Sequence, residues 1–459
     1  MAVVSRSKPR VRTPKPRSPP SGIWWPDALT RTNRPATSLT RQLGLPGAVG
    51  LGLGSILGTG VFVSLALVAE ISGALVLPAI LLAALLALFN ALASAELAAA
   101  HPVSGGAYEY GHVWLTPSLG FVAGWVFLLA KSASAATAAL GVSAYVRHLT
   151  EGEADGLAVP LAVLTSVGVT ALVISGLRRS SAVNMAIVSV TGLALIALIA
   201  ASMVRTDPPV IGITGAGLDP DWSLLASATA LMFVAYTGYG RIATLAEEVR
   251  DPVRVIPLAI LLTLVISAAL YLGVGWAVVR AAGAGVVLDA AGGAPLEAVA
   301  RALQRPGLAT LVAMGAVTAM LGVLLNLVLG LSRIVLAMGR RGDLPPRFAH
   351  VDARGVPTAA VLLVGAGITG LVLIGDIRLA WSFSAFTVLI YYAINNLAAL
   401  RLSRAQRLYP RLVPALGLAG CVLLAFQVPW PVWTTGLALI VGALVLRAAL
   451  SRPRSGRLP

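Results

Sequence analysis

Charged residues are scarce in this chain. They make up 11% of its 459 residues, whereas a soluble domain carries about a quarter, so they are too few to cover a water-facing surface. Hydrophobic residues make up 58%, and the mean hydropathy is +0.88. A membrane-spanning helix needs roughly 20 mostly apolar residues. The composition therefore excludes a soluble enzyme, a disordered protein and a secreted disulfide scaffold, and it indicates an all-α integral membrane protein.

Cysteine and histidine are also scarce. The single cysteine, Cys421, cannot form an intrachain disulfide. The four histidines lie in loops or at segment ends without the spacing of metal ligands, and the chain has no Gly-x-x-x-x-Gly-Lys motif for a phosphate. We therefore expect no metal, no cofactor and no enzymatic activity.

Long apolar segments recur along the whole chain. We predict twelve membrane-spanning helices from them, near residues 47–66, 73–100, 118–146, 158–176, 183–204, 223–246, 256–280, 308–337, 358–375, 379–400, 411–427 and 430–449.

Basic residues are unevenly distributed between the loops. If the N-terminus is cytoplasmic, 25 of the 34 lysines and arginines fall in cytoplasmic tails and loops, six in the opposite loops and three within segments. Lysine and arginine resist translocation, so this bias places both termini in the cytoplasm and favours twelve spans over eleven in the cytoplasmic membrane. The excess of arginine over lysine and the abundance of alanine indicate a bacterial source.

The two ends of the chain differ from the apolar segments. Residues 1–41 hold nine basic residues and many prolines without helical periodicity, so we expect a disordered basic cytoplasmic tail. A contact with anionic lipid explains these charges better than nucleic-acid binding, and we expect no nucleic acid as a partner. Residues 450–459 are expected to form a second cytoplasmic tail.

Glycines interrupt two of the twelve segments. The first reads Gly-Leu-Gly-Leu-Gly-Ser-Ile-Leu-Gly-Thr-Gly over 50–60, and the sixth reads Tyr-Thr-Gly-Tyr-Gly over 236–240. Glycine costs about 1 kcal/mol against alanine inside a helix, so both are places where a helix can unwind. If spans one to five and six to ten form two halves, each interruption lies in the first span of its half, which is a sequence pointer to a transporter's substrate site. The alternative is close helix packing through small residues.

An interrupted helix offers two kinds of backbone group. Its second half presents free N–H groups with partial positive charge, and its first half ends in free carbonyls with partial negative charge. Free N–H groups suit a carboxylate and free carbonyls suit an ammonium. One interrupted helix could thus hold a zwitterion such as an amino acid without an ionised side chain.

Four stretches resemble the amino-acid permeases of the amino acid–polyamine–organocation superfamily. They follow one another in the family's order over nearly three quarters of the chain, which is specific for the family and not for a substrate. The stretches are Gly-Ser-Ile-Leu-Gly-Thr-Gly-Val-Phe-Val over 54–63, Ala-Glu-Leu-Ala-Ala-Ala-His-Pro-Val-Ser-Gly-Gly-Ala-Tyr-Glu-Tyr over 95–110 with Gly-Trp at 124–125, Phe-Val-Ala-Tyr-Thr-Gly-Tyr-Gly over 233–240 with Glu-Glu-Val-Arg-Asp-Pro over 247–252, and Ser-Arg at 332–333 with Met-Gly-Arg-Arg-Gly-Asp-Leu-Pro over 338–345.

The resemblance implies a five-plus-five inverted-repeat fold with two extra C-terminal helices. It places a transporter domain over residues 42–449, with repeat one at about 47–204, repeat two at about 223–400 and the extra helices at about 411–449. Helices 1 and 6 would be unwound at mid-membrane, and the site between them would open to the two sides in turn.

The resemblance also implies which residues bind the substrate. Backbone N–H groups at Gly58, Thr59 and Gly60 would hold its carboxylate, and Thr59 could add its hydroxyl. The carbonyls that would hold its amine are those near Ile56, Val234, Ala235 and Thr237.

One lysine lies within a predicted span. Some proton-coupled relatives carry a coupling lysine in span five, where this chain has Thr191 by alignment. We hypothesise that Lys131 in span three carries the proton instead, because an ionisable group inside a span is a functional candidate. The alternative is a structural ammonium bound to carbonyls or to a carboxylate.

Several further residues are candidates for gating. Arg241 could face the substrate's side chain, or it could pair with Glu248 two turns away on the same helical face. Glu96, near the inner end of span two, is expected to have a structural or gating role. Tyr236 and Tyr239 flank the second interruption and could close over the substrate or pack in the helix interface.

Taken together, these residues predict a secondary active transporter of amino acids or related amines, with a proton as the expected coupling ion. Exchange of one solute for another is the main alternative. A membrane sensor that keeps the fold without net transport is a weaker one. The sequence does not specify the substrate's side chain.

Overall fold

The computed structural model describes residues 44–101, 105–149, 155–176, 181–204, 221–244, 249, 251–283, 294–352 and 355–450. The chain divides into two units, Met1–Leu39 and Thr40–Pro459, and the fold described below belongs to the second. The predicted basic tail and residues 451–459 lie outside the described residues, as do Glu247 and Glu248.

The described residues form helices and no β-strand. Their α-helices are α1 (Leu45–Ile56), α2 (Leu65–Ser72), α3 (Val76–Ala100), α4 (Ala107–Trp114), α5 (Pro117–Leu149), α6 (Ala158–Ile174), α7 (Ser181–Val204), α8 (Trp222–Tyr236), α9 (Gly240–Thr244), α10 (Pro252–Gly283), α11 (Pro295–Ala302), α12 (Leu308–Arg341), α13 (Thr358–Val372), α14 (Ile377–Leu400), α15 (Leu412–Ala425) and α16 (Trp430–Leu450). Short helical turns are η2 (Gly60–Ser64), a π-helix, and the 3₁₀ turns η3 (Gly73–Leu75), η4 (Asp155–Leu157), η5 (Thr237–Tyr239) and η6 (Pro346–Ala349).

Seven of the described helices are long and apolar enough to cross a membrane, and an eighth candidate is the bent pair formed by α1 and residues 60–72. Three shorter apolar helices, α6, α13 and α15, accompany them. Apolar helices satisfy their own backbone hydrogen bonds, as a bilayer requires. The chain is therefore a multi-pass helical membrane protein.

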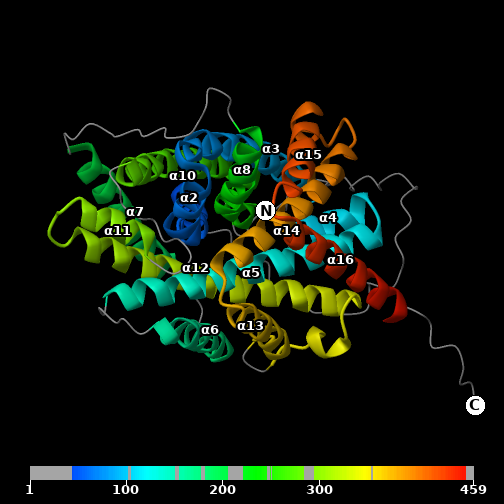
Figure 1. The fold of residues 1–459 in the computed structure, drawn as a ribbon. Helices are drawn as coiled ribbons and strands as arrows, with labels where there is room; N and C mark the ends of the chain where they lie inside the picture. The colour runs from blue at the N-terminus through cyan, green and yellow to red at the C-terminus, as the bar shows by residue number, and fades with distance from the viewer. Residues whose placement is uncertain are drawn as a thin grey trace, which may run out of the picture. The chain divides into compact units, whose positions relative to one another are not determined.

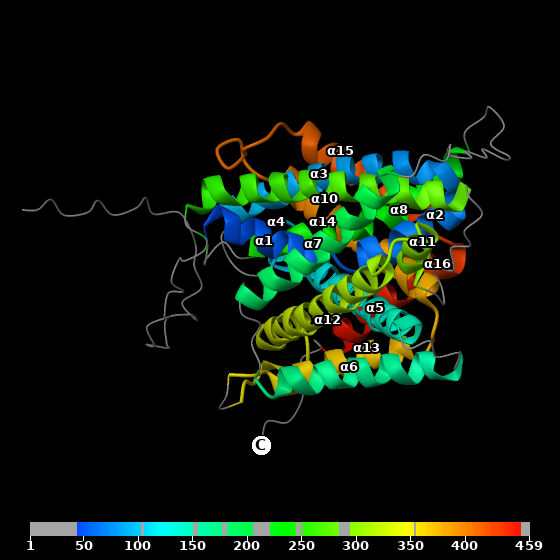
Figure 2. The same cartoon turned by 90° about the vertical axis from the view of Figure 1, so that its left-hand side faces the viewer.

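The helices pack in layers that mix early and late parts of the chain. Figure 2 shows α6 and α13 side by side along one edge and α3 with α10 along the opposite edge, with α5 and α12 between them. Figure 1 shows α2 next to both α8 and α10. Segments from the two halves of the sequence thus alternate in space and bury a shared core.

Local signals fix several helix ends. Asp221 caps α8 by accepting hydrogen bonds from the backbone N–H groups of Ser223 and Leu224. At the other end of a helix, α12 stops at Gly342, whose φ of 84° is left-handed and favours glycine. The short helices α4 and α11 were not predicted from the sequence, because neither has an apolar run of spanning length.

Candidate functional site

The first glycine-rich segment contains a break in its helix. The helix α1 ends at Ile56, the π-helix η2 begins at Gly60, and the two parts are bent by 42°. Leu57 has extended backbone angles (φ −76°, ψ 95°), which stop the α-helical ladder. Among the described residues, the N–H groups of Gly58 and Thr59 donate no backbone hydrogen bond. This leaves two amide donors at the start of η2 for a ligand.

Thr59 adds a side-chain donor at the same place. Its side chain is 3% exposed, and its hydroxyl has no hydrogen-bond partner within the described part of the chain. An unpaired buried hydroxyl costs about 1–3 kcal/mol. An acceptor such as a carboxylate placed at the break would offset this cost.

The second glycine-rich segment is interrupted differently. The helix α8 ends at Tyr236 and continues through the tighter turn η5 into α9. Both the backbone N–H and the hydroxyl of Thr237 donate to the carbonyl of Val234, the hydroxyl at 2.7 Å. The end of α8 is thus held by Thr237 itself.

The two interruptions lie directly against each other. A β-carbon on Gly238 would overlap the backbone carbonyl of Ser55 in α1. A β-carbon on Gly60 would lie 2.7 Å from the β-carbon of Ala235 in α8. Glycine is therefore needed at both positions for this close approach.

Tyr271 of α10 joins the ends of the two first halves. Its hydroxyl lies 3.0 Å from the carbonyl oxygen of Ile56 and 3.1 Å from that of Ala235. These are two of the carbonyls expected to hold a substrate amine, so the tyrosine hydroxyl occupies the position of an ammonium donor. The sequence gave no signal for Tyr271, because a lone tyrosine in an apolar span has no distinctive pattern.

Lys131 of α5 reaches the second interruption. Its side chain is 9% exposed, and its ammonium donates to the Thr237 hydroxyl at 2.7 Å. This is its one hydrogen bond among the described residues, and no described carboxylate lies within ion-pair distance of it. An ammonium has three donors, so two remain for another acceptor.

Three further residues that the sequence singled out, Tyr236, Tyr239 and Thr191, are fully buried in the helical bundle. Tyr236 and Tyr239 are both fully buried, with their rings 5.0 Å from Tyr271 and 5.6 Å from Tyr392. Thr191 of α7 is fully buried, and its hydroxyl has no hydrogen-bond partner among the described residues.

Arg241 and Glu96 have partners outside the interruptions. Arg241 donates to the carbonyl of Asn326 in α12 at 3.3 Å, while Glu248, its predicted partner, lies outside the described residues. Glu96 is fully buried and accepts a hydrogen bond of 2.8 Å from the N–H of Leu408. The Glu96 carboxylate thus connects α3 to the loop between α14 and α15.

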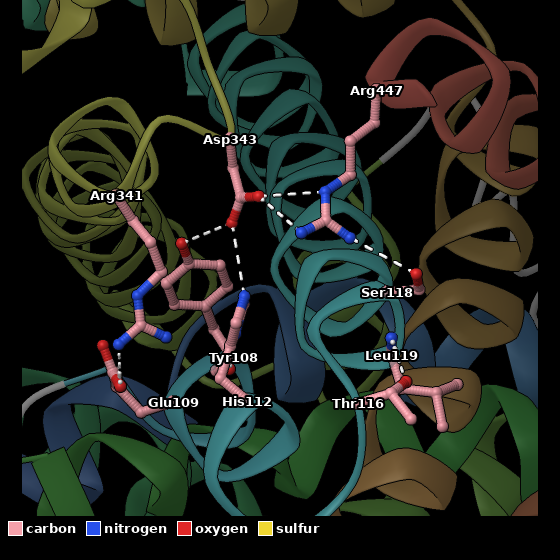
Figure 3. A network of polar contacts seen from close by, with 9 residues as sticks. All are labelled: Tyr108, Glu109, His112, Thr116, Ser118, Leu119, Arg341, Asp343 and Arg447. Atoms are coloured by element: carbon pink, nitrogen blue, oxygen red, sulfur yellow. Dashed lines mark hydrogen bonds and ion pairs between the residues drawn. The ribbon is translucent and has the colours of Figure 1, made fainter. Parts of the chain in front are cut away.

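A second polar region surrounds the carboxylate of Asp343, at the end of α12 (Figure 3). We call it the Asp343 cluster, and its members are Tyr108, His112, Asp343 and Arg447. The Tyr108 hydroxyl donates to the carboxylate at 2.7 Å, Arg447 Nε donates at 3.0 Å, and His112 Nε2 lies 3.5 Å away. The cluster joins α4, the loop after α12, and α16.

These partners control the ionisation of Asp343. Burial alone would raise the pKa of its carboxyl, but hydrogen bonds from His112 and Tyr108 and the charge of Arg447 together lower that pKa below its ordinary value. Burial also raises the pKa of the Tyr108 hydroxyl, so Tyr108 keeps its proton and donates it. The sequence signal for this cluster was limited to the Gly-Arg-Arg-Gly-Asp run.

The interruptions and the Asp343 cluster differ in chemistry. The interruptions offer unpaired N–H and hydroxyl donors next to backbone carbonyls, which suits a small molecule with both charges. Interrupted helices in a membrane-spanning helical bundle are a feature of many transporter folds.

The comparisons with known proteins agree with this class. The chain belongs to the amino acid permease family, whose sequence profile its residues 47–453 match. It is 42% identical to an uncharacterized transporter of Mycobacterium tuberculosis over 90% of this chain and 93% of that protein.

More distant relatives carry different substrate names. The branched-chain amino acid permease of Bacillus subtilis is 26% identical over 91% of this chain and 94% of its own length. The cationic amino acid transporter 4 of Homo sapiens is 30% identical over 81% of this chain and 61% of its own length. The family thus supports amino acid transport and leaves the side chain open.

Proposed function

We propose that this protein is a secondary active transporter that moves amino acids, or closely related amines, across the cytoplasmic membrane by alternating access. The observation that carries this proposal is the contact between two interrupted helices at Gly60 and Gly238, beside the unpaired donors of Gly58 and Thr59. Unsatisfied backbone groups inside a bilayer are tolerated where they line a cavity. A ligand with a carboxylate satisfies them.

The proposed topology has twelve spans. A described helix lies in each of the twelve apolar segments, counting α1 with η2 and α2 as one span and α8 with η5 and α9 as another. We assign spans one to five and six to ten to two inverted repeats, with α15 and α16 as the extra helices. The interruptions then lie in the first span of each repeat at mid-membrane, both termini face the cytoplasm, and the Asp343 cluster lies on the cytoplasmic side.

The proposed substrate contacts use the unpaired donors of the first interruption and the two carbonyls that the Tyr271 hydroxyl now occupies. The substrate carboxylate binds the N–H groups of Gly58, Thr59 and Gly60 and the Thr59 hydroxyl. Its amine takes the place of the Tyr271 hydroxyl at the carbonyls of Ile56 and Ala235. The carbonyl of Val234 already accepts two hydrogen bonds from Thr237, which leaves Ile56 and Ala235 as the principal acceptors.

The direct test is a thermal-shift screen of the purified full-length protein against amino acids and polyamines, followed by uptake of the stabilising compounds into proteoliposomes. A ligand that binds only the folded state raises the midpoint temperature of unfolding by mass action. Transport requires uptake of the same compound, whereas a sensor would bind it without net flux. A protein that neither binds nor moves any amino acid or amine contradicts the proposal.

We further propose that a proton drives uptake and that Lys131 carries it, because Thr191 stands where some relatives have the coupling lysine. Lys131→Ala should abolish the stimulation of uptake by an inwardly acidic pH gradient. An unchanged stimulation would rule out this role of Lys131. If uptake instead requires substrate loaded inside the vesicles and ignores the gradient, the protein is an exchanger.

A further inference from the structure

The ammonium of Lys131 has too few partners for a buried charge. It is 9% exposed, and its single hydrogen bond among the described residues goes to the Thr237 hydroxyl. The Thr237 hydroxyl in turn donates its own hydrogen bond to the carbonyl of Val234. The three groups therefore form a chain in which Lys131 can only donate.

The neighbouring polar groups are already engaged with one another. Ser134, one turn along α5, pairs with Ser384 of α14 at 2.8 Å. The Tyr392 hydroxyl lies 3.4 Å from the carbonyl of Thr237. Lys131 donates to none of these groups, so its two remaining N–H groups point to a ligand that is anionic or rich in acceptors.

An isolated buried ammonium is costly, since its charge has left water without compensation. The amino and carboxylate groups of a bound amino acid cancel each other at the interruptions. A neutral side chain then leaves the Lys131 charge uncompensated, and a cationic one places a second positive charge beside it in a medium of low dielectric. Among amino acid side chains, a carboxylate is the class that compensates the charge of Lys131 while the lysine keeps its proton.

We propose that Lys131 pairs with the side-chain carboxylate of the transported amino acid, so that the site selects acidic amino acids and rejects cationic amino acids and polyamines. This inference rests on the proposed function and narrows its substrate class. It separates this chain from relatives named for branched-chain and cationic substrates. It also agrees with a coupling role, because the protonated lysine would enter the loaded state together with its anion.

The test compares ligand ranking within single preparations. Wild-type protein is titrated with L-glutamate, L-glutamine, L-leucine and L-arginine, and the midpoint shift and uptake are recorded for each. We expect glutamate to bind most tightly and arginine least. Lys131→Gln should weaken the binding of glutamate by roughly 30-fold or more, which is the cost of removing one partner of a buried charge pair. It should change the binding of glutamine only slightly.

A charge reversal sharpens the result. Lys131→Glu should invert the order of glutamate and arginine, while Lys131→Arg should keep it. Ser134→Ala removes a neutral hydrogen bond one turn away and should leave the order unchanged. Because each ratio is taken within one preparation, a smaller folded fraction does not alter it.

Two failures are distinguishable. If the wild-type protein transports leucine or arginine in preference to glutamate, or if Lys131→Glu leaves the ranking intact, the substrate class is wrong while the transport function stands. If no amino acid binds or moves, the proposed function itself fails, and the assignment of Lys131 fails with it.

Discussion

The helix interruptions and the Asp343 cluster are both buried and polar, but they differ in how many hydrogen-bond partners their polar groups have. In the Asp343 cluster the carboxylate accepts from Tyr108 and Arg447 and lies close to His112. At the interruptions, the Thr59 hydroxyl has no described partner and Lys131 has one. A polar cluster whose groups have partners contributes to stability, whereas an unpaired buried polar group calls for an explanation such as a ligand. We therefore expect a structural role for the Asp343 cluster and ligand binding at the interruptions.

The largest expected effect comes from filling the space between the two interruptions. In Gly238→Ala the new methyl group would overlap the carbonyl of Ser55, and overpacking of this kind costs about 1–3 kcal/mol or more. Uptake into proteoliposomes should fall roughly tenfold or more. Gly330→Ala in α12 is the matched control, since a β-carbon there meets nothing within 4 Å. Equal activity of the two variants would show that the interruptions do not need their close contact.

The unpaired hydroxyl at the first interruption predicts an effect on binding without a loss of stability. Thr59→Val keeps the shape of the side chain and removes a hydroxyl that has no described partner. A hydrogen bond to a charged group contributes about 1.5–3 kcal/mol, so substrate affinity should fall roughly tenfold or more. The midpoint of thermal unfolding of the ligand-free protein should stay the same or rise. A lower midpoint with unchanged affinity would contradict the assignment.

The Asp343 cluster predicts the reverse pattern. Asp343→Asn weakens the hydrogen bonds from Tyr108 and Arg447, so the free energy of unfolding should fall by about 1–3 kcal/mol. Chemical or thermal denaturation in detergent measures this loss. Substrate affinity of the remaining folded protein should be unchanged, since Asp343 lies outside the interruptions. A selective loss of affinity would mean that the cluster takes part in binding.

The smallest expected effect is a pH dependence of that same cluster. The folded pKa of Asp343 is lowered, so its stabilisation is fully present above the unfolded value of about 3.9 and is lost as pH falls through the lower folded pKa. Between pH 6 and pH 3 the thermal midpoint of wild-type protein should therefore fall more than that of Asp343→Asn. If the thermal midpoints of the two proteins fall in parallel between pH 6 and pH 3, Asp343 contributes nothing to the loss of stability in acid.

Much of the helical arrangement could be predicted from hydropathy alone. The segment predicted at 158–176 is the helix Ala158–Ile174, and the segment at 379–400 is contained in Ile377–Leu400. Long apolar runs have one structural solution in a bilayer, because the backbone must satisfy itself. Helices such as α4 and α11 follow no such constraint and gave no signal.

The site could be predicted only in part. Glycine spacing pointed to both interruptions, since glycine alone permits the approach of Gly60 to Ala235 and of Gly238 to Ser55. The meeting of Tyr271 with the carbonyls of Ile56 and Ala235 depends on how α10 packs against α1 and α8, and no local pattern encodes it. The bond from Lys131 to Thr237 spans 106 positions in the sequence and was equally invisible.

The most direct measurement is a structure of the protein bound to the amino acid that gives the largest thermal shift. The account predicts that the ligand's carboxylate lies within hydrogen-bond distance of the N–H groups of Gly58 and Thr59, with its amine at the carbonyls of Ile56 and Ala235. A ligand bound elsewhere, with the stretch from Ile56 to Gly60 unchanged and unoccupied, would contradict it.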